Sequence, residues 1–194
     1  MMLHATARIL KYGAALGGGA AFAVCALYVS ESGAQSGPSI SSHAVIAADS
    51  SNASPIYGVG IPSEYRDWKL ISVTHEEGDF NQLRAQLGNE MAMRAFREGK
   101  LPFPDGSIIV ALHWKRVPSD EDNKIFGRDQ AFVAGPAVNI QVMVKDSTRY
   151  AATGGWGFGD FREGKPSDKA LHEKCFVCHT PAKDTDYVYT HYAP

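Results

Sequence analysis

The stretch Ser107-Ile108-Ile109-Val110-Ala111-Leu112-His113-Trp114-Lys115 decides the fold class of this chain. It is rich in β-branched residues, which favour a strand, and turn-forming residues precede it at 102–106. Shorter strand patterns occur elsewhere, at 68–74, 138–144 and 156–161, with a strand or extended segment at 80–87. The sequence therefore predicts a mainly antiparallel β-sheet of four or five strands.

Helix signals flank these strands. Asn89 can cap a helix that runs to about Arg97 and is ended by Gly99. Ser167 or Asp168 can cap a second helix near the C-terminus, whereas residues 119–128 predict a polar loop. We therefore expect an α+β fold, in which an antiparallel sheet is flanked by helices and a C-terminal helix carries two cysteines.

That helix contains Cys175-Phe176-Val177-Cys178-His179. The spacing Cys-x-x-Cys-His is the attachment signature of c-type haem. Two thiols on one helical turn can add to the two vinyl groups of a haem, and the adjacent imidazole can then reach the iron. The motif indicates one haem c, attached through Cys175 and Cys178, with His179 as an iron ligand.

Two other kinds of site use similar spacing. A structural zinc site needs four ligands, and the chain has one further cysteine, Cys25, so His172 and His191 would have to complete the set. A redox Cys-x-x-Cys is expected near a βαβ pattern, which the motif's surroundings do not show. The sequence favours haem attachment over both.

The N-terminus has the pattern of a secretory signal peptide. Arg8 and Lys11 give a positive region, residues 12–30 carry no charge and include an apolar run, and Ser32-Gly33-Ala34 supplies small residues near a cleavage point. An uncleaved membrane anchor is the alternative, because the run approaches spanning length. We predict a cleaved signal peptide over residues 1–34 and a periplasmic location, since c-type haem is attached outside the cytoplasm.

Composition indicates one globular domain with extensions. Residues 35–55 form a Ser-rich linker, and the domain is expected over residues 56–194. The chain is 44% hydrophobic and 21% charged, as soluble domains are. Its net charge of -2 shows no basic bias, so nucleic acid is not an expected partner.

Several segments of the domain resemble the cytochrome P-460 superfamily, which includes the cytochromes c′-β. They follow the family's order and spacing over roughly Ile56 to Pro194. The matching segments are Tyr65-Arg66-Asp67-Trp68, Phe80 with Leu83-Arg84, Asp105-Gly106-Ser107, Val144-Lys145-Asp146-Ser147-x-Arg149-Tyr150, Gly155-Trp156-x-Phe158, the Cys-x-x-Cys-His motif, and Lys183-x-Thr185-Asp186-x-Val188-Tyr189-Thr190. The resemblance implies a β-rich homodimer with one c-type haem, His179 as proximal ligand and an open distal face.

The resemblance also implies a branch of the family. The lysine-linked branch bonds a lysine to the haem edge and oxidises hydroxylamine, whereas the c′-β branch lacks this bond and binds gases such as nitric oxide. Ala111 falls at the cross-linking lysine position, and Lys115 lies roughly 13 Å further along the strand. Gln141 replaces the family's pocket carboxylate, and Arg84 matches its distal arginine. Hydroxylamine oxidation is therefore disfavoured.

Three residues are candidates for the distal site. Arg84 can donate hydrogen bonds to a bound ligand, although a surface salt bridge is the alternative. Gln141 can orient a ligand but does not titrate. His113 can act as an acid–base group or a sixth iron ligand, although a hydrogen-bonded structural histidine is more common. Axial methionine ligation is possible at Met91, Met93 and Met143, with core packing as the alternative.

Two functions follow from these residues. The first is an exported mono-haem cytochrome that binds or redox-transforms a small gaseous or nitrogenous ligand of the nitric oxide, hydroxylamine or peroxide class. The second is a six-coordinate periplasmic electron carrier. Both imply a periplasmic redox partner, and they differ in whether the sixth coordination position is open.

Overall fold

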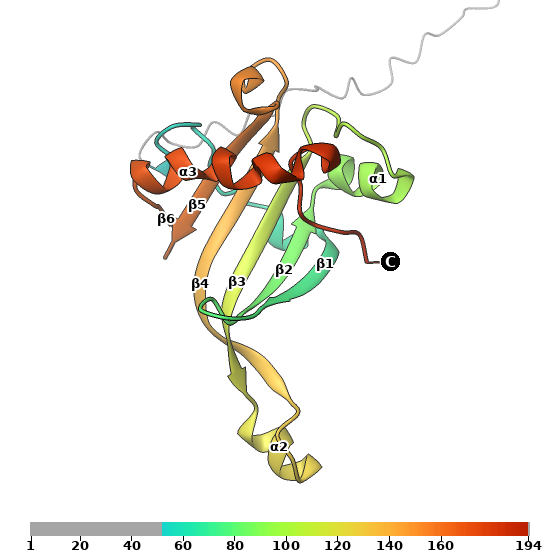
Figure 1. The fold of residues 1–194 in the computed structure, drawn as a ribbon, viewed down its shortest axis with the longest axis vertical. Helices are drawn as coiled ribbons and strands as arrows, with labels where there is room; N and C mark the ends of the chain where they lie inside the picture. The colour runs from blue at the N-terminus through green and yellow to red at the C-terminus, as the bar shows by residue number, and fades with distance from the viewer. Residues whose placement is uncertain (1–51, 194) are drawn as a thin grey trace, which may run out of the picture. The chain divides into compact units, whose positions relative to one another are not determined.

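The structure is a computed structural model that describes residues 52–193 (Figure 1). The expected signal peptide and residues 35–51 of the expected linker lie outside the described residues. Ser54, at the end of that linker, is buried and donates a hydrogen bond to the carbonyl of Phe158. No helix within residues 52–193 combines the length and the apolar character that crossing a membrane requires.

Six antiparallel strands form one sheet, in which each strand pairs with the next along the chain. The strands are β1 (Lys69–Glu76), β2 (Gln82–Gly88), β3 (Ile108–Pro118), β4 (Phe132–Lys145), β5 (Trp156–Arg162) and β6 (Lys165–Pro166). The α+β prediction is confirmed, and the sheet has more strands than expected. The extra strand, β6, has two residues and follows a tight turn in which Glu163 and Gly164 both have positive φ. Such a short strand leaves no periodic signal in the sequence.

The two predicted helices are present with the predicted caps. In α1 (Glu90–Glu98) the Asn89 side chain accepts a hydrogen bond from the N–H of Ala92, and Gly99 ends the helix in a left-handed conformation. In α3 (Lys169–His179) the N-cap is Asp168, whose side chain accepts from the N–H of Leu171.

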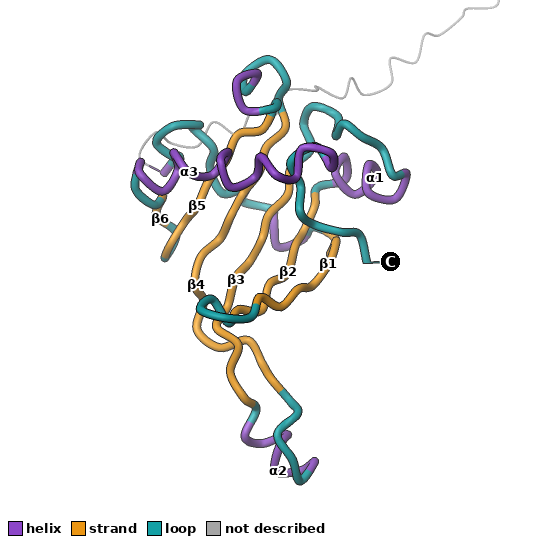
Figure 2. The backbone as a smooth tube through the Cα atoms, viewed as in Figure 1, coloured by secondary structure: helices purple, strands orange, loops and turns teal. Residues whose placement is uncertain are grey.

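The loop prediction over residues 119–128 was wrong. A short helix, α2 (Asp120–Phe126), occupies this segment at the tip of the β3–β4 hairpin, away from α1 and α3 (Figure 2). Ser119 caps it by accepting a hydrogen bond from the N–H of Asp122, and Gly127 ends it. The segment has cap residues but no apolar periodicity, so the sequence pattern did not predict a helix. The described residues also contain the 3-10 turns η2 (Tyr65–Asp67), η3 (Ala151–Thr153) and η4 (Thr180–Thr185).

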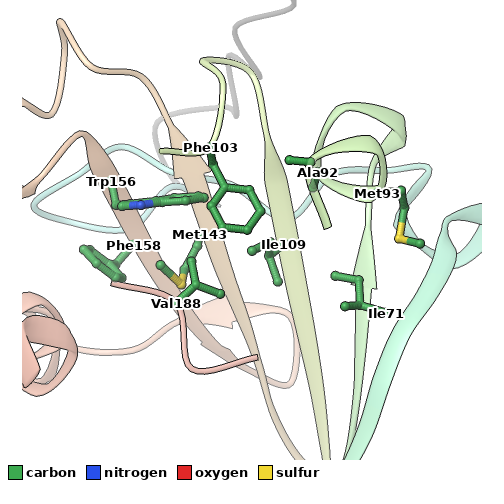
Figure 3. Close-up of a cluster of buried hydrophobic side chains, with 10 residues drawn as sticks. Ile71, Ala92, Met93, Phe103, Ile109, Met143, Trp156, Phe158 and Val188 are labelled. Carbon is green, nitrogen blue, oxygen red and sulfur yellow. The ribbon is translucent and has the colours of Figure 1, made fainter. Parts of the chain in front are cut away.

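The two faces of the sheet bury different clusters. On β3, Ile109 faces α1 and α3, whereas Val110 packs on the opposite face against the segment that precedes β1. Figure 3 shows the first cluster, in which Trp156 and Phe158 of β5 gather with side chains of β3 and β4. Because Cys175 and Phe176 of α3 pack against this cluster, it fixes the C-terminal helix to the sheet.

Candidate functional site

Helix α3 places both cysteines and His179 on adjacent turns. Cys175 and Cys178 are three residues apart, so they share one face of the helix. Cys175 is half-buried and its thiol contacts the carbonyl of Leu171 at 3.7 Å, while Cys178 is exposed. Neither forms a disulfide within the described part of the chain. The arrangement leaves both thiols on the helix that also carries His179.

His179 is held in one tautomer. Its Nδ1 lies 2.7 Å from the carbonyl oxygen of Tyr187, which only accepts hydrogen bonds, so Nδ1 carries the proton and Nε2 has a free lone pair. Burial lowers the pKa of His179, and the hydrogen bond to Tyr187 opposes this. The ring packs 5.0 Å from Phe158 and 5.4 Å from Tyr189, measured between ring centroids. A neutral imidazole with a fixed ring is the form that binds a metal.

The thiol chemistry argues against a redox dithiol. Burial raises the pKa of Cys175 to about 11, and the neighbouring Asp160 and Cys178 act in the same direction. Redox Cys-x-x-Cys motifs instead lower the pKa of the attacking cysteine, because the thiolate is the nucleophile. Cys175 is thus protonated at neutral pH.

A zinc site finds no support in the geometry either. His172 is fully buried, and both ring nitrogens are engaged: Nδ1 with the carbonyl of Asp168 at 2.8 Å and Nε2 with the N–H of Asp160 at 3.0 Å. Across residues 52–193 no group of three or more His, Cys, Asp or Glu side chains is placed to hold a metal ion. His172 instead joins α3 to β5.

The structure brings the three distal candidates together on the sheet face that α3 covers. Ala111 on β3 pairs with Gln141 on β4, and two residues further along β3, His113 pairs with Arg84 on β2. Ala111 and His113 are two residues apart, so their side chains point to the same face as Ile109. Across the sheet at this level, Ala111 also pairs with Gln86 on β2, and Gln141 also pairs with Asp160 on β5.

This face is polar and incompletely hydrogen-bonded. Of the buried polar side-chain atoms without a partner in the described chain, four lie on it: Arg84 Nε, Gln86 Oε1, His113 Nε2 and Asn139 Oδ1. Buried polar atoms are nearly always paired with protein, water or ligand in native proteins. The donors and acceptors of this face therefore fit a site that receives a polar group.

Arg84 forms a salt bridge, which was the alternative to a role as a hydrogen-bond donor to a ligand. Its guanidinium forms an ion pair with Glu76 of β1, and its side chain is only 22% exposed. Burial lowers its pKa, yet arginine remains charged at any pH at which the protein folds. The ion pair engages Nη2 and leaves the Nε–H as a donor on the face that α3 covers.

His113 is buried and neutral. Its Nδ1 lies 3.0 Å from Gln82 Oε1, an acceptor, so Nδ1 carries the proton and Nε2 is unprotonated. Burial, reinforced by the nearby charge of Arg84, lowers the pKa of His113 to about 4, while Asp160 and Gln141 oppose the shift. At neutral pH the ring therefore offers a lone pair, not a proton, at Nε2.

Asp160 is a candidate site residue that the sequence analysis missed. Its carboxylate accepts hydrogen bonds from Asn139 Nδ2 at 2.5 Å, Ser167 Oγ at 2.5 Å and Gln141 Nε2 at 3.3 Å. A buried carboxylate with three donors is held rigidly and orients both amides. The sequence feature that could have identified Asp160 is the alternation of large and small residues over 156–159. It places Asp160 on the same strand face as Trp156 and Phe158.

The remaining candidates lie elsewhere. Lys115 is exposed and donates to the carbonyl of Phe80 at 3.4 Å, in the β1–β2 turn. Met93 is in the core, and Met91 is exposed beside Gly106. Met143 packs in the cluster of Figure 3.

These features define a β-sheet protein of the haem-binding class. They are the antiparallel sheet, the helix that carries Cys-x-x-Cys-His, and the His179 ring held by its hydrogen bond to Tyr187. The sequence model of one family, described as Cytochrome P460, matches residues 62–190. The chain belongs to this family and is a haem c cytochrome. A search of curated proteins found no match.

Proposed function

We propose that this protein is an exported mono-haem cytochrome of the c′-β type, whose distal site binds or redox-transforms a small ligand. Cys175 and Cys178 carry the haem, and His179 binds its iron. The ligand belongs to the nitric oxide, hydroxylamine or peroxide class. Ala111 favours this branch, because an alanine cannot form the lysine cross-link on which hydroxylamine oxidation depends.

The observation that carries the proposal is the free Nε2 of His179. The hydrogen bond from Nδ1 to Tyr187 makes Nε2 the only ring nitrogen available to a metal, one residue after Cys178. When bound, the haem iron supplies reversible ligand binding and one-electron chemistry.

The chain's own residues position the ligand. Arg84 donates a charge-assisted hydrogen bond from Nε, which stabilises negative charge that develops on a bound ligand. Asp160 holds the amides of Asn139 and Gln141 by their NH2 groups, so their oxygens are left as acceptors. His113 contributes a further acceptor at Nε2 and does not act as a general acid at neutral pH.

The same Nε2 of His113 favours one alternative, a six-coordinate electron carrier. A neutral imidazole whose Nδ1–H is bound to Gln82 has the protonation state of an iron ligand. In this case the histidine would close the sixth position and exclude small ligands.

An optical spectrum separates the two functions. The full chain is produced with a c-type maturation system, and the ferrous protein is recorded with and without nitric oxide or carbon monoxide. We expect a high-spin spectrum that changes with either gas. A low-spin spectrum that ignores both gases, and becomes high-spin in His113→Ala, would establish the electron carrier instead.

Mass spectrometry and a matched pair of variants test the residues. The holoprotein should carry one haem through two thioethers, with no additional linkage. Arg84→Leu should weaken ligand binding by roughly 10- to 100-fold, the equivalent of a lost charge-assisted hydrogen bond. The exposed Arg97→Leu on α1 serves as the control and should leave the affinity unchanged.

Location and assembly are part of the same proposal. We expect a periplasmic protein that forms a homodimer and exchanges electrons with a periplasmic redox partner. Cell fractionation and analytical ultracentrifugation of the holoprotein test the first two expectations.

A further inference from the structure

The turn after η4 has an unusual backbone. Asp186 and Tyr187 both adopt left-handed conformations, with φ of 54° and 65°. Residues with a Cβ rarely do so, and two in succession need surrounding contacts to hold them. This turn supplies the carbonyl of Tyr187 that accepts the Nδ1–H of His179.

A buried ion pair holds the first of these residues. Lys145 Nζ lies 2.8 Å from both carboxylate oxygens of Asp186, and the two side chains are 5% and 9% exposed. The N–H of Phe103 donates to Asp186 Oδ2 at 2.8 Å, and Trp156 Nε1 donates to the Asp186 carbonyl at 2.7 Å. Asp186 is thereby fixed through its side chain and its backbone at once.

The second residue is held by packing. The N–H of Tyr187 donates to the carbonyl of Ala182 at 2.7 Å, and its ring packs at a tilt against Phe176 of α3, with 5.3 Å between ring centroids. On the other side the ring lies against Gly154, where an added Cβ would come within 2.2 Å of the Tyr187 ring. Lys145 also donates to the carbonyl of Gly154 at 3.0 Å, so the ion pair and the glycine belong to one cluster.

A buried ion pair is weak evidence of a stability role, because desolvation of the charges offsets their attraction. We therefore consider the geometry that the ion pair imposes, not its contribution to stability. The pair joins β4, which carries Lys145, to the strained turn, and the carbonyl of that turn fixes the ring of His179.

We propose that Lys145 and Asp186 are positioning residues for His179: the ion pair holds the Asp186–Tyr187 turn so that the Tyr187 carbonyl accepts the Nδ1–H of His179. This inference rests on the proposed function, in which His179 binds the iron. A hydrogen bond to Nδ1–H makes the imidazole a stronger donor to iron, which stabilises the ferric state. Loss of the ion pair weakens that hydrogen bond.

Two variants, Asp186→Asn and Lys145→Met, test the proposal in the full-chain holoprotein. Both should lower the iron–histidine stretching frequency in the resonance Raman spectrum of the ferrous protein. Both should also raise the reduction potential. For this one-electron couple, a tenfold shift of the ferric–ferrous equilibrium corresponds to about 59 mV. A purely electrostatic role predicts opposite signs, because one variant removes a negative charge and the other a positive charge.

Glu173→Gln is the matched control, since Glu173 pairs with Lys169 on the exposed surface of α3. It should change neither the potential nor the stretching frequency. Potentials that move in opposite directions in the two variants, or an unchanged stretching frequency in both, would overturn the proposal. So would loss of folded holoprotein in both variants, because the pair would then serve the fold as a whole.

The wild-type spectrum separates this proposal from the function on which it rests. If the wild-type iron shows no histidine ligation, the proposed function fails. If the wild-type iron has a histidine ligand and the two variants match it, only the positioning role fails.

Discussion

Replacing His113 with asparagine should make the stability of the holoprotein less sensitive to acid. In the native protein the pKa of His113 is about 4, against an ordinary value of 6.5. Between these two values the unfolded chain binds a proton that the native protein excludes. The stability that depends on neutral His113 is therefore complete above pH 6.5 and is lost as the pH falls towards 4.

The magnitude follows from the two pKa values. Between pH 7 and pH 5 this one group should remove about 2 kcal/mol from the free energy of unfolding, and about 3 kcal/mol by pH 4. Asparagine can retain the hydrogen bond to Gln82 Oε1 but does not titrate. The variant should therefore lose about 2 kcal/mol less than the wild type over the same interval.

Guanidinium chloride unfolding at pH 7 and pH 5, followed by tryptophan fluorescence, measures this difference. Carboxylates elsewhere contribute equally to both proteins, so their effect cancels in the comparison. His75→Asn, which replaces an exposed histidine on β1, is the control and should follow the wild type. Parallel pH dependence in wild type and His113→Asn would refute the reasoning.

Three further predictions concern other parts of the site and its support. Asp160→Asn should lower the free energy of unfolding by about 2–3 kcal/mol, because an amide nitrogen cannot accept the hydrogen bonds of the carboxylate; a change in the urea midpoint too small to resolve would contradict this. Asn89→Ala should cost about 1–2 kcal/mol, since Asn89 caps α1 and also accepts from the N–H of Ile108, and Asn89→Asp should recover part of the loss in the same assay. Cys178→Ser should leave one thioether in the mass spectrum of any haem-loaded protein; two would show that another residue attaches the haem.

The sequence anticipated the features that local interactions control. Asn89, Gly99 and Asp168 act on backbone groups within a few residues, so their caps were predictable and are present. α2 had caps of the same kind but no apolar periodicity, and it was missed. The β-branched residues over 107–115 marked the strand β3, on which Ala111 and His113 are two residues apart and so point to the same face.

The distal face needed the register between strands. Asp160 meets Gln141 because β4 and β5 pair with one particular register, and a shift of one residue would send its side chain to the opposite face. No local pattern marked Asp160 as the partner of Asn139 and Gln141. The sequence therefore supplied individual polar residues, and the sheet assembled them.

The chain by itself determined its chemical class, because the Cys-x-x-Cys-His spacing involves only neighbouring residues of one helix and β-branched residues favour a strand locally. Only the tertiary structure decided how the His179 ring is held. Lys145 and Asp186 are 41 residues apart, and the carbonyl that fixes His179 is defined by backbone conformation and not by residue type. Contacts between distant segments depend on how the sheet and the C-terminal turn pack together, and sequence spacing carries no record of that packing.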